Sequence, residues 1–159
     1  MPAVRRLILI LLILLIVVRG GTLALDPGSE DGRVQRIVDG DTLVVRVDGR
    51  EESVRLLGID TPERSPAECG SVAATNALAE LADGRRVELV PDATQDERDR
   101  YGRLLAYVEA GGNDVGEALV RRGWAEVYVF DEPFARLDEY REAAAEAESA
   151  GRGLFGRCS

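Results

Sequence analysis

Residues 55–63, with the sequence RLLGIDTPE, bring together side chains that can bind a metal ion or a phosphate. Arg55 falls among alternating apolar residues, so in an extended strand its guanidinium leaves on the face opposite the core. The glycine and proline that follow predict a turn, and Asp60 and Glu63 flank it. The stretch therefore offers an acid pair beside a fixed cation. An ordinary strand end with a solvated turn has the same composition.

Two other stretches hold residues of the same kinds. Residues 39–42 (DGDT) place two carboxylates around a glycine that permits a tight turn. An EF-hand calcium loop also begins with Asp-x-Asp, but Val44 and Arg50 stand where that loop needs glycine and glutamate, which excludes it. Residues 99–107 (DRYGRLLAY) put Arg103 directly before an apolar strand. Each stretch alone is also typical of a surface turn.

The composition excludes several kinds of active site. The chain has 20 basic residues and no histidine, and all 20 are arginine. A P-loop needs a lysine, whereas zincins, serine triads and histidine general bases need histidine. Hydrolytic chemistry here must therefore use carboxylates, arginines and metal. The net charge of −9 opposes tight, nonspecific binding of a polyanion, but it permits local binding of single phosphates.

The beginning of the chain resembles an export signal. Two arginines precede an apolar run at residues 7–18, which is short for a membrane span of about 20 residues. Small residues follow it, so we expect cleavage near Ala24, although an uncleaved membrane anchor also fits. We interpret residues 1–24 as the signal peptide or anchor, 25–32 as a linker and 33–159 as one domain. The protein is then secreted or held at the cell surface.

Export would place the two cysteines in an oxidising compartment. Cys69 and Cys158 have only each other as an intramolecular partner. We therefore predict one disulfide between them.

The periodicity along the chain predicts five short strands and three helices. The strands are read from alternating apolar residues and the helices from apolar residues spaced three and four apart. Three antiparallel strands come first, then a helix, two more strands and two helices. This order indicates the α+β class, with a five-stranded OB-type β-barrel. The expected strands are residues 34–38, 42–47, one through Arg55, 86–90 and 104–108, and the expected helices are residues 70–81, 115–122 and 134–150.

These pieces, in this order, resemble the staphylococcal nuclease (thermonuclease) family over residues 32–156. The motifs that carry the resemblance are specific only as a set. They are VDGDT at residues 38–42, VRLLGIDTPE at 54–63, YGRLLAY at 101–107 and NDVGEALVRRGWA at 113–125.

The resemblance implies a calcium-dependent phosphodiesterase, an endonuclease with DNA or RNA as its substrate and no protein partner indicated. By motif position, Asp41, Asp60 and the Thr61 carbonyl would ligate calcium, with Asp39 in an outer shell. Calcium takes about 6 to 8 oxygen ligands, so two carboxylates, a carbonyl, waters and a substrate phosphate suit it.

The resemblance also implies catalytic roles for three residues. Glu63 would be the general base that activates water, and Arg55 and Arg103 would grip the phosphate with planar, bidentate donors. An OB-fold module that binds nucleic acid or oligosaccharide without cleaving it remains an alternative. A module that only binds its ligand does not need the complete set of acids and arginines. The presence of the whole set therefore favours a phosphodiesterase over a binding module.

Overall fold

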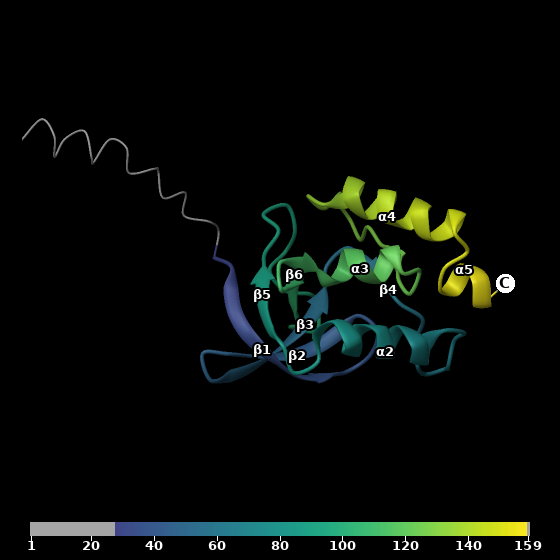
Figure 1. Cartoon of the computed structure of the whole chain (residues 1–159). Coiled ribbons are helices and arrows are strands. Elements are labelled where there is room, and N and C mark those ends of the chain that lie inside the picture. Colours follow the sequence, from purple (N-terminus) through teal and green to yellow (C-terminus); the bar gives the residue numbers. More distant parts are fainter. Residues whose placement is uncertain (1–27, 159) are drawn as a thin grey trace, which may run out of the picture.

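A computed structural model describes residues 28–158 of the chain (Figure 1). The expected signal peptide or anchor at residues 1–24 lies outside the described residues. The first strand, β1 (Glu30–Ile37), begins inside the predicted linker rather than at residue 34. Its first residues do not alternate between apolar and polar types. One of them, Gly32, packs directly on the neighbouring strand, where an added Cβ would lie 2.3 Å from Val45 Cγ1.

Five strands form the closed barrel that the sequence predicts. The sheet order is β3-β2-β1-β5-β6, and a parallel pairing between β3 and β6 closes it. All the other pairings around the barrel are antiparallel. The fold is therefore an OB-type barrel of the α+β class, as expected. The strands that follow β1 are β2 (Thr42–Val47), β3 (Arg50–Leu56), β5 (Arg86–Val90) and β6 (Leu104–Ala110).

Three very short strands complete the described structure. β4 (Ile59–Asp60) pairs with β8 (Glu126–Val127) in a separate two-stranded sheet, and β7 (Asn113–Asp114) pairs with the end of β6. Two residues show no periodicity, so sequence patterns did not predict these strands. The pair β4 and β8 matters because it fixes the chain at Asp60 and at the residue before it.

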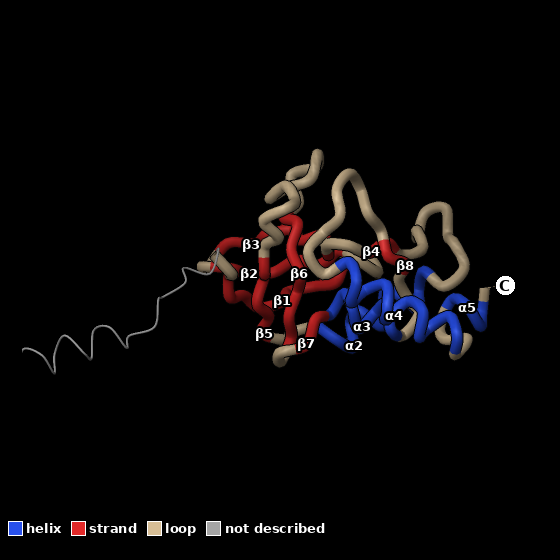
Figure 2. Tube along the Cα trace, turned by 90° about the horizontal axis from the view of Figure 1, so that it is seen from above, coloured by secondary structure: helices blue, strands red, loops and turns tan. Residues whose placement is uncertain are grey.

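The three expected helices are present and lie together at one end of the barrel (Figure 2). They are α2 (Ser71–Ala82), α3 (Val115–Arg121) and α4 (Leu137–Ser149), followed by the short α5 (Leu154–Arg157). The last long helix begins at Leu137 rather than at residue 134. Within residues 28–158, no helix has the length and apolar character needed to span a membrane.

One apolar core joins the barrel interior to the helices. Leu43, Val54 and Val108 are fully buried inside the barrel, and Leu119 and Tyr140 join them from α3 and α4. Burying a side chain of this size favours folding by about 1.5 to 3 kcal/mol. The helices therefore complete the barrel core.

A disulfide joins Cys69 to Cys158, with a Cα–Cα distance of 5.8 Å. The predicted pairing is confirmed. It ties the residue before α2 to the chain end just after α5, across a sequence separation of 89 residues.

Candidate active site

One open cleft of about 1130 Å³ is lined by five of the six residues singled out from the sequence. The barrel register explains this convergence. Thr42 lies opposite Arg55 in the antiparallel pair β2–β3, and Arg55 lies beside Leu105 in the parallel pair β3–β6. The turn before β2, the end of β3 and the loop before β6 therefore meet at one place. The five lining residues are Asp41, Arg55, Asp60, Glu63 and Arg103.

The sixth residue, Thr61, contacts Asp41 directly. Asp41 is only 7% exposed, and both of its carboxylate oxygens are engaged. Oδ2 accepts hydrogen bonds from the Thr61 amide at 3.1 Å and the Thr61 hydroxyl at 2.8 Å, and Oδ1 accepts one from the Thr42 hydroxyl at 3.1 Å. Burial raises the pKa of Asp41, and the nearby Arg55 guanidinium and Thr61 hydroxyl partly oppose that rise.

Arg55 is held on several sides by acceptors. Its Nε lies 3.1 Å from Asp41 Oδ1, and its Nη2 lies 3.0 Å from Asp60 Oδ1. Nη1 donates at 2.8 Å to the carbonyls of both Leu56 and Ile59. The guanidinium is therefore fixed in one orientation before any ligand arrives, and it draws two carboxylates to one point.

Arg103 is anchored through one part of its guanidinium. Its Nε lies 2.6 Å from Asp99 Oδ2, and its Nη1 donates to Thr42 Oγ1 at 3.2 Å. Burial alone would raise the pKa of Asp99, but hydrogen bonds from the Arg103 side chain and from the amides of Arg103 and Tyr101 outweigh it, so that pKa is lowered. Sequence reasoning gave Asp99 no role, although its spacing of four residues from Arg103 was a usable signal.

Glu63 differs from these residues because it is exposed and lies in the loop after β4. Its backbone amide donates to Glu68 Oε2 at 2.8 Å. Within residues 28–158 its own carboxylate has no hydrogen bond or ion pair. It therefore lines the cleft as an acceptor that no neighbouring cation occupies.

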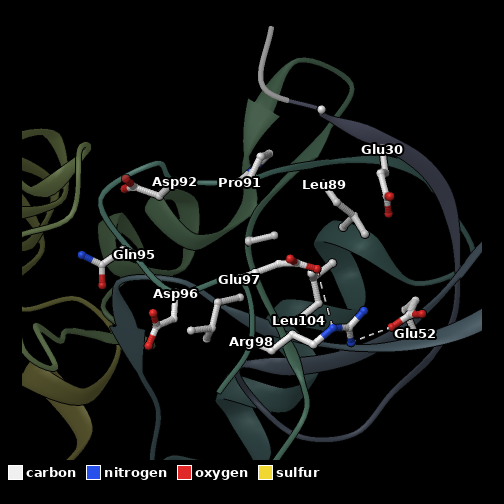
Figure 3. A pocket seen from close by; sticks show the side chains of 13 residues that line it. Glu30, Glu52, Leu89, Pro91, Asp92, Gln95, Asp96, Glu97, Arg98 and Leu104 are labelled. Carbon is white, nitrogen blue, oxygen red and sulfur yellow. Dashed lines mark hydrogen bonds and ion pairs between the residues drawn. The ribbon is translucent and has the colours of Figure 1, made fainter. Parts of the chain in front are cut away.

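The loop before β6 also has a partner outside the cleft. Arg98 Nη1 lies 3.0 Å from Glu52 Oε2 on β3, across a smaller cavity of about 410 Å³ (Figure 3). Arg98 therefore ties this loop to the barrel wall on the side away from Asp41, which supports the position of Arg103.

The family model for staphylococcal nuclease homologues matches residues 53–157. The chain belongs to the staphylococcal nuclease family. Its curated relatives include a thermonuclease of Staphylococcus intermedius, 38% identical over 63% of this chain and 61% of that protein. Endonuclease YncB of Bacillus subtilis is 38% identical over 73% of this chain and 57% of that protein.

Another relative in the staphylococcal nuclease family is the SPbeta prophage-derived endonuclease YokF of Bacillus subtilis, 39% identical over 80% of this chain and 44% of that protein. The chain thus spans less than two thirds of the length of each of these three relatives.

The staphylococcal nuclease family is metal-dependent, and the oxygen ligands present suit a hard divalent metal ion. Asp41 and Asp60 contact the same guanidinium, so their carboxylates converge. In the part of the chain that the structure describes, no group of three or more acidic, histidine or cysteine side chains is placed to hold a metal. The protein would then supply two carboxylates and a backbone carbonyl, and water and substrate would complete the coordination.

Aromatic side chains line the other side of the cleft. Tyr101, Tyr128 and Phe130 are 69%, 46% and 72% exposed, and all three face the same cleft as Arg55. The guanidinium of Arg103 lies 5.5 Å from the centre of the Tyr101 ring. Their exposure shows that Tyr128 and Phe130 are walls of the cleft rather than core residues.

Proposed function

We propose that this protein is a calcium-dependent nuclease that hydrolyses phosphodiester bonds in DNA, RNA or both. The observation that carries the proposal is the meeting of Asp41, Asp60, Arg55, Glu63 and Arg103 in one open cleft. The relatives named as endonucleases and thermonuclease support the same reaction class. A module that only binds nucleic acid would need neither an unpaired acid nor converging carboxylates.

In this proposal Asp41, Asp60 and the Thr61 carbonyl hold calcium, with Asp39 outside them. Asp39 Oδ1 accepts the Asp41 amide at 3.2 Å, so it braces the turn that carries Asp41. When bound, calcium supplies positive charge that offsets the charge building on the phosphate oxygens. Thr61 has a second task, because its amide and hydroxyl orient Asp41.

The two arginines orient the phosphate. Arg55 is already fixed by carbonyl oxygens, so binding substrate costs it little conformational entropy. Arg103 uses Nε and Nη1 for Asp99 and Thr42, and its Nη2 has no partner among the described residues. That nitrogen remains a donor for a phosphate oxygen, and charge-assisted hydrogen bonds of this kind are strong.

Glu63 is the general base. Its exposed carboxylate has no competing cation within residues 28–158, so it can accept a proton from a water molecule that attacks phosphorus in line with the leaving oxygen. Positioned proton transfer of this kind contributes about 10²–10⁴ to a rate. The protein's own share of the mechanism is therefore orientation by the arginines and proton removal by Glu63.

Digestion of a labelled single strand tests the function. The purified domain should cleave the strand in calcium, stop when a chelator is added, and recover only poorly in magnesium, because magnesium demands a stricter octahedral geometry than calcium. Binding of the strand without cleavage in calcium would support the noncatalytic alternative. Full activity in magnesium with calcium chelated would refute calcium dependence.

We also propose that the protein is exported, and either secreted or attached to the membrane through residues 7–18. The disulfide between Cys69 and Cys158 supports an oxidising compartment. Fractionation of producing cells, with mass spectrometry of the N-terminus, tests this. A mature N-terminus near residue 25 indicates a cleaved signal, an intact N-terminus in the membrane fraction indicates an anchor, and reduced protein in the cytosol refutes export.

A further inference from the structure

The backbone of Glu63 is paired with a single residue of the same loop. The Glu63 amide donates to Glu68 Oε2 at 2.8 Å, and the Glu68 amide donates to the Glu63 carbonyl at 2.9 Å. Both backbone polar groups of Glu63 are therefore paired with Glu68, one through a side chain and one through the main chain. Residues 63–69 are otherwise exposed. The position of Glu63 thus depends on how firmly Glu68 is held.

Glu68 stands at a well-anchored point. The next residue, Cys69, is linked by the disulfide to Cys158, and the Glu68 carbonyl accepts the Ser71 amide at 3.2 Å at the start of α2. Gly70 packs so closely on the C-terminal helix that an added Cβ would lie 2.2 Å from Leu154 Cδ2. A covalent link and close packing therefore fix the chain on the helix side of the loop.

The other side of the loop is fixed by the site itself. Thr61 is bound to Asp41 through its amide and its hydroxyl, and Pro62 restricts its own φ angle. Glu63 is the first residue beyond these constraints. Because its carboxylate has no partner within residues 28–158, its side chain can be directed only through its backbone.

We propose that Glu68 is a positioning residue that holds the backbone of Glu63 so that the Glu63 carboxylate faces the cleft. The carboxylate of Glu68 acts here as a hydrogen-bond acceptor rather than as a charge. This inference rests on the proposed function, because it assigns Glu68 a task only if Glu63 removes a proton during cleavage. Small displacements of a reacting group cost up to about 10²-fold in rate, so loss of this hydrogen bond reduces turnover.

Amide hydrogen exchange tests the contact without any reaction. In the parent the Glu63 amide should exchange slowly for an exposed loop, and in Glu68→Ala it should exchange about tenfold faster or more, since its acceptor is gone. In Glu68→Gln the side-chain oxygen can still accept, so protection should be largely kept. Equal exchange in the parent and in Glu68→Ala would overturn the proposal.

Kinetics test the consequence. On a labelled single strand in calcium, Glu68→Ala should lower kcat about tenfold to 100-fold with little change in KM, and Glu68→Gln should restore kcat to near the parent. The matched control is Glu142→Ala, which removes an exposed acid on α4. Thermal melts of all variants show whether the fold is intact, and the Gln variant retains the loop's hydrogen bonds.

The outcomes separate this inference from the proposed function. Parental kcat in Glu68→Ala, together with a strong loss in Glu63→Gln, would overturn the positioning role and leave the function intact. An equal loss in Glu68→Ala and Glu68→Gln would also overturn it, because the charge rather than the hydrogen bond would then matter. Parental kcat in Glu63→Gln would refute the general base and overturn the positioning role of Glu68 with it, even if the exchange experiment shows that Glu68 holds the Glu63 amide.

Discussion

Asp41 and Glu63 are carboxylates of one cleft, but the regions that hold them are built differently. Asp41 precedes a barrel strand, is 7% exposed, and has both oxygens bound by Thr42, Thr61 and Arg55. Glu63 lies in an exposed loop and is fixed through its backbone alone. We call Asp41, Arg55 and Thr61 the barrel floor, and we call Glu63 and Arg103 the loop rim.

This difference indicates that stability and chemistry are coupled in the barrel floor and separable in the loop rim. In the barrel floor, removing a partner leaves a buried charge or an unpaired polar group, which costs folding free energy. In the loop rim, a side chain can change while the barrel core stays packed. Substitutions in the two regions should therefore give different combinations of lost stability and lost activity.

The largest effect should come from Glu63→Gln in the loop rim. The amide keeps the size of the side chain but cannot accept a proton, so kcat should fall by about 10²–10⁴. The melting temperature should stay at the parental value, because the side chain is exposed and unpaired within residues 28–158. Steady-state kinetics and a thermal melt check both halves. Parental kcat would remove Glu63 from the mechanism.

Arg55→Gln in the barrel floor should lower stability and activity together. Breaking a largely buried ion pair leaves Asp41 without its counter-charge, so the free energy of unfolding should fall by roughly 3 kcal/mol, and cleavage should be lost as well. Urea denaturation measures the stability.

Arg46→Gln on β2 is the matched control for Arg55→Gln. Its ion pair with Glu51 is exposed, so the loss should be less than about 1 kcal/mol. Equal losses in the two variants would show that burial does not make the ion pair of Arg55 more important for stability than an exposed one.

A smaller effect is expected from Arg103→Lys in the loop rim. The ammonium keeps the charge but loses the planar fork that contacts Asp99 and leaves Nη2 for phosphate. Transition-state binding, measured as kcat/KM, should weaken by roughly 1.5 to 3 kcal/mol with little change in stability. Arg141→Lys on the exposed face of α4 serves as the control. Parental kinetics would reduce Arg103 to a solvated arginine.

The smallest effect is expected on the pH dependence of stability. It comes from Asp92, which supports the cleft wall but belongs neither to the barrel floor nor to the loop rim. Asp92 is buried, and burial alone would raise its pKa, but hydrogen bonds from the Tyr107 hydroxyl, from Thr94 and from the Ala135 amide together lower it. The native state therefore binds fewer protons than the unfolded state below about pH 4, so stability falls as pH falls through the folded pKa.

Asp92→Asn should flatten that acid limb of the stability curve. Urea denaturation from pH 7 to pH 3 measures it, with Asp138→Asn, a fully exposed change on α4, as the control. An unchanged acid slope in Asp92→Asn would show that this carboxylate does not set the acid sensitivity.

Local patterns were sufficient to predict the barrel strands and the motif residues. Residues 42–47 alternate, and Asp48 and Gly49 signal a hairpin turn, so β2 and β3 follow from periodicity and turn chemistry. The motif residues were predicted as a set through the resemblance to the staphylococcal nuclease family, because each stretch alone is also typical of a surface turn. Their convergence in one cleft follows from the curling of the barrel, which is expected of short twisted sheets.

The residues that the sequence did not predict act through hydrogen bonds to backbone groups or to residues distant in the chain. Glu68 holds an amide and Asp92 holds an amide and a hydroxyl on other elements, and neither contact leaves a periodic signature. Phe134 was assigned to a helix because it is apolar at the right spacing, whereas it packs over Gly58 ahead of the helix. Burial against another element, not helical periodicity, decided its position.

The parallel pairing of β3 with β6 also determines when, during folding, the proposed site becomes complete. Val54 meets Leu104 about fifty positions later in the chain, so this contact carries a large loop-closure entropy and suits a late step of folding. Until β6 has been synthesised and paired, Arg103 has no place beside Arg55. A chain emerging from the ribosome already carries Asp41, Asp60 and Glu63 before the barrel closes, so the proposed site stays incomplete until β3 and β6 pair.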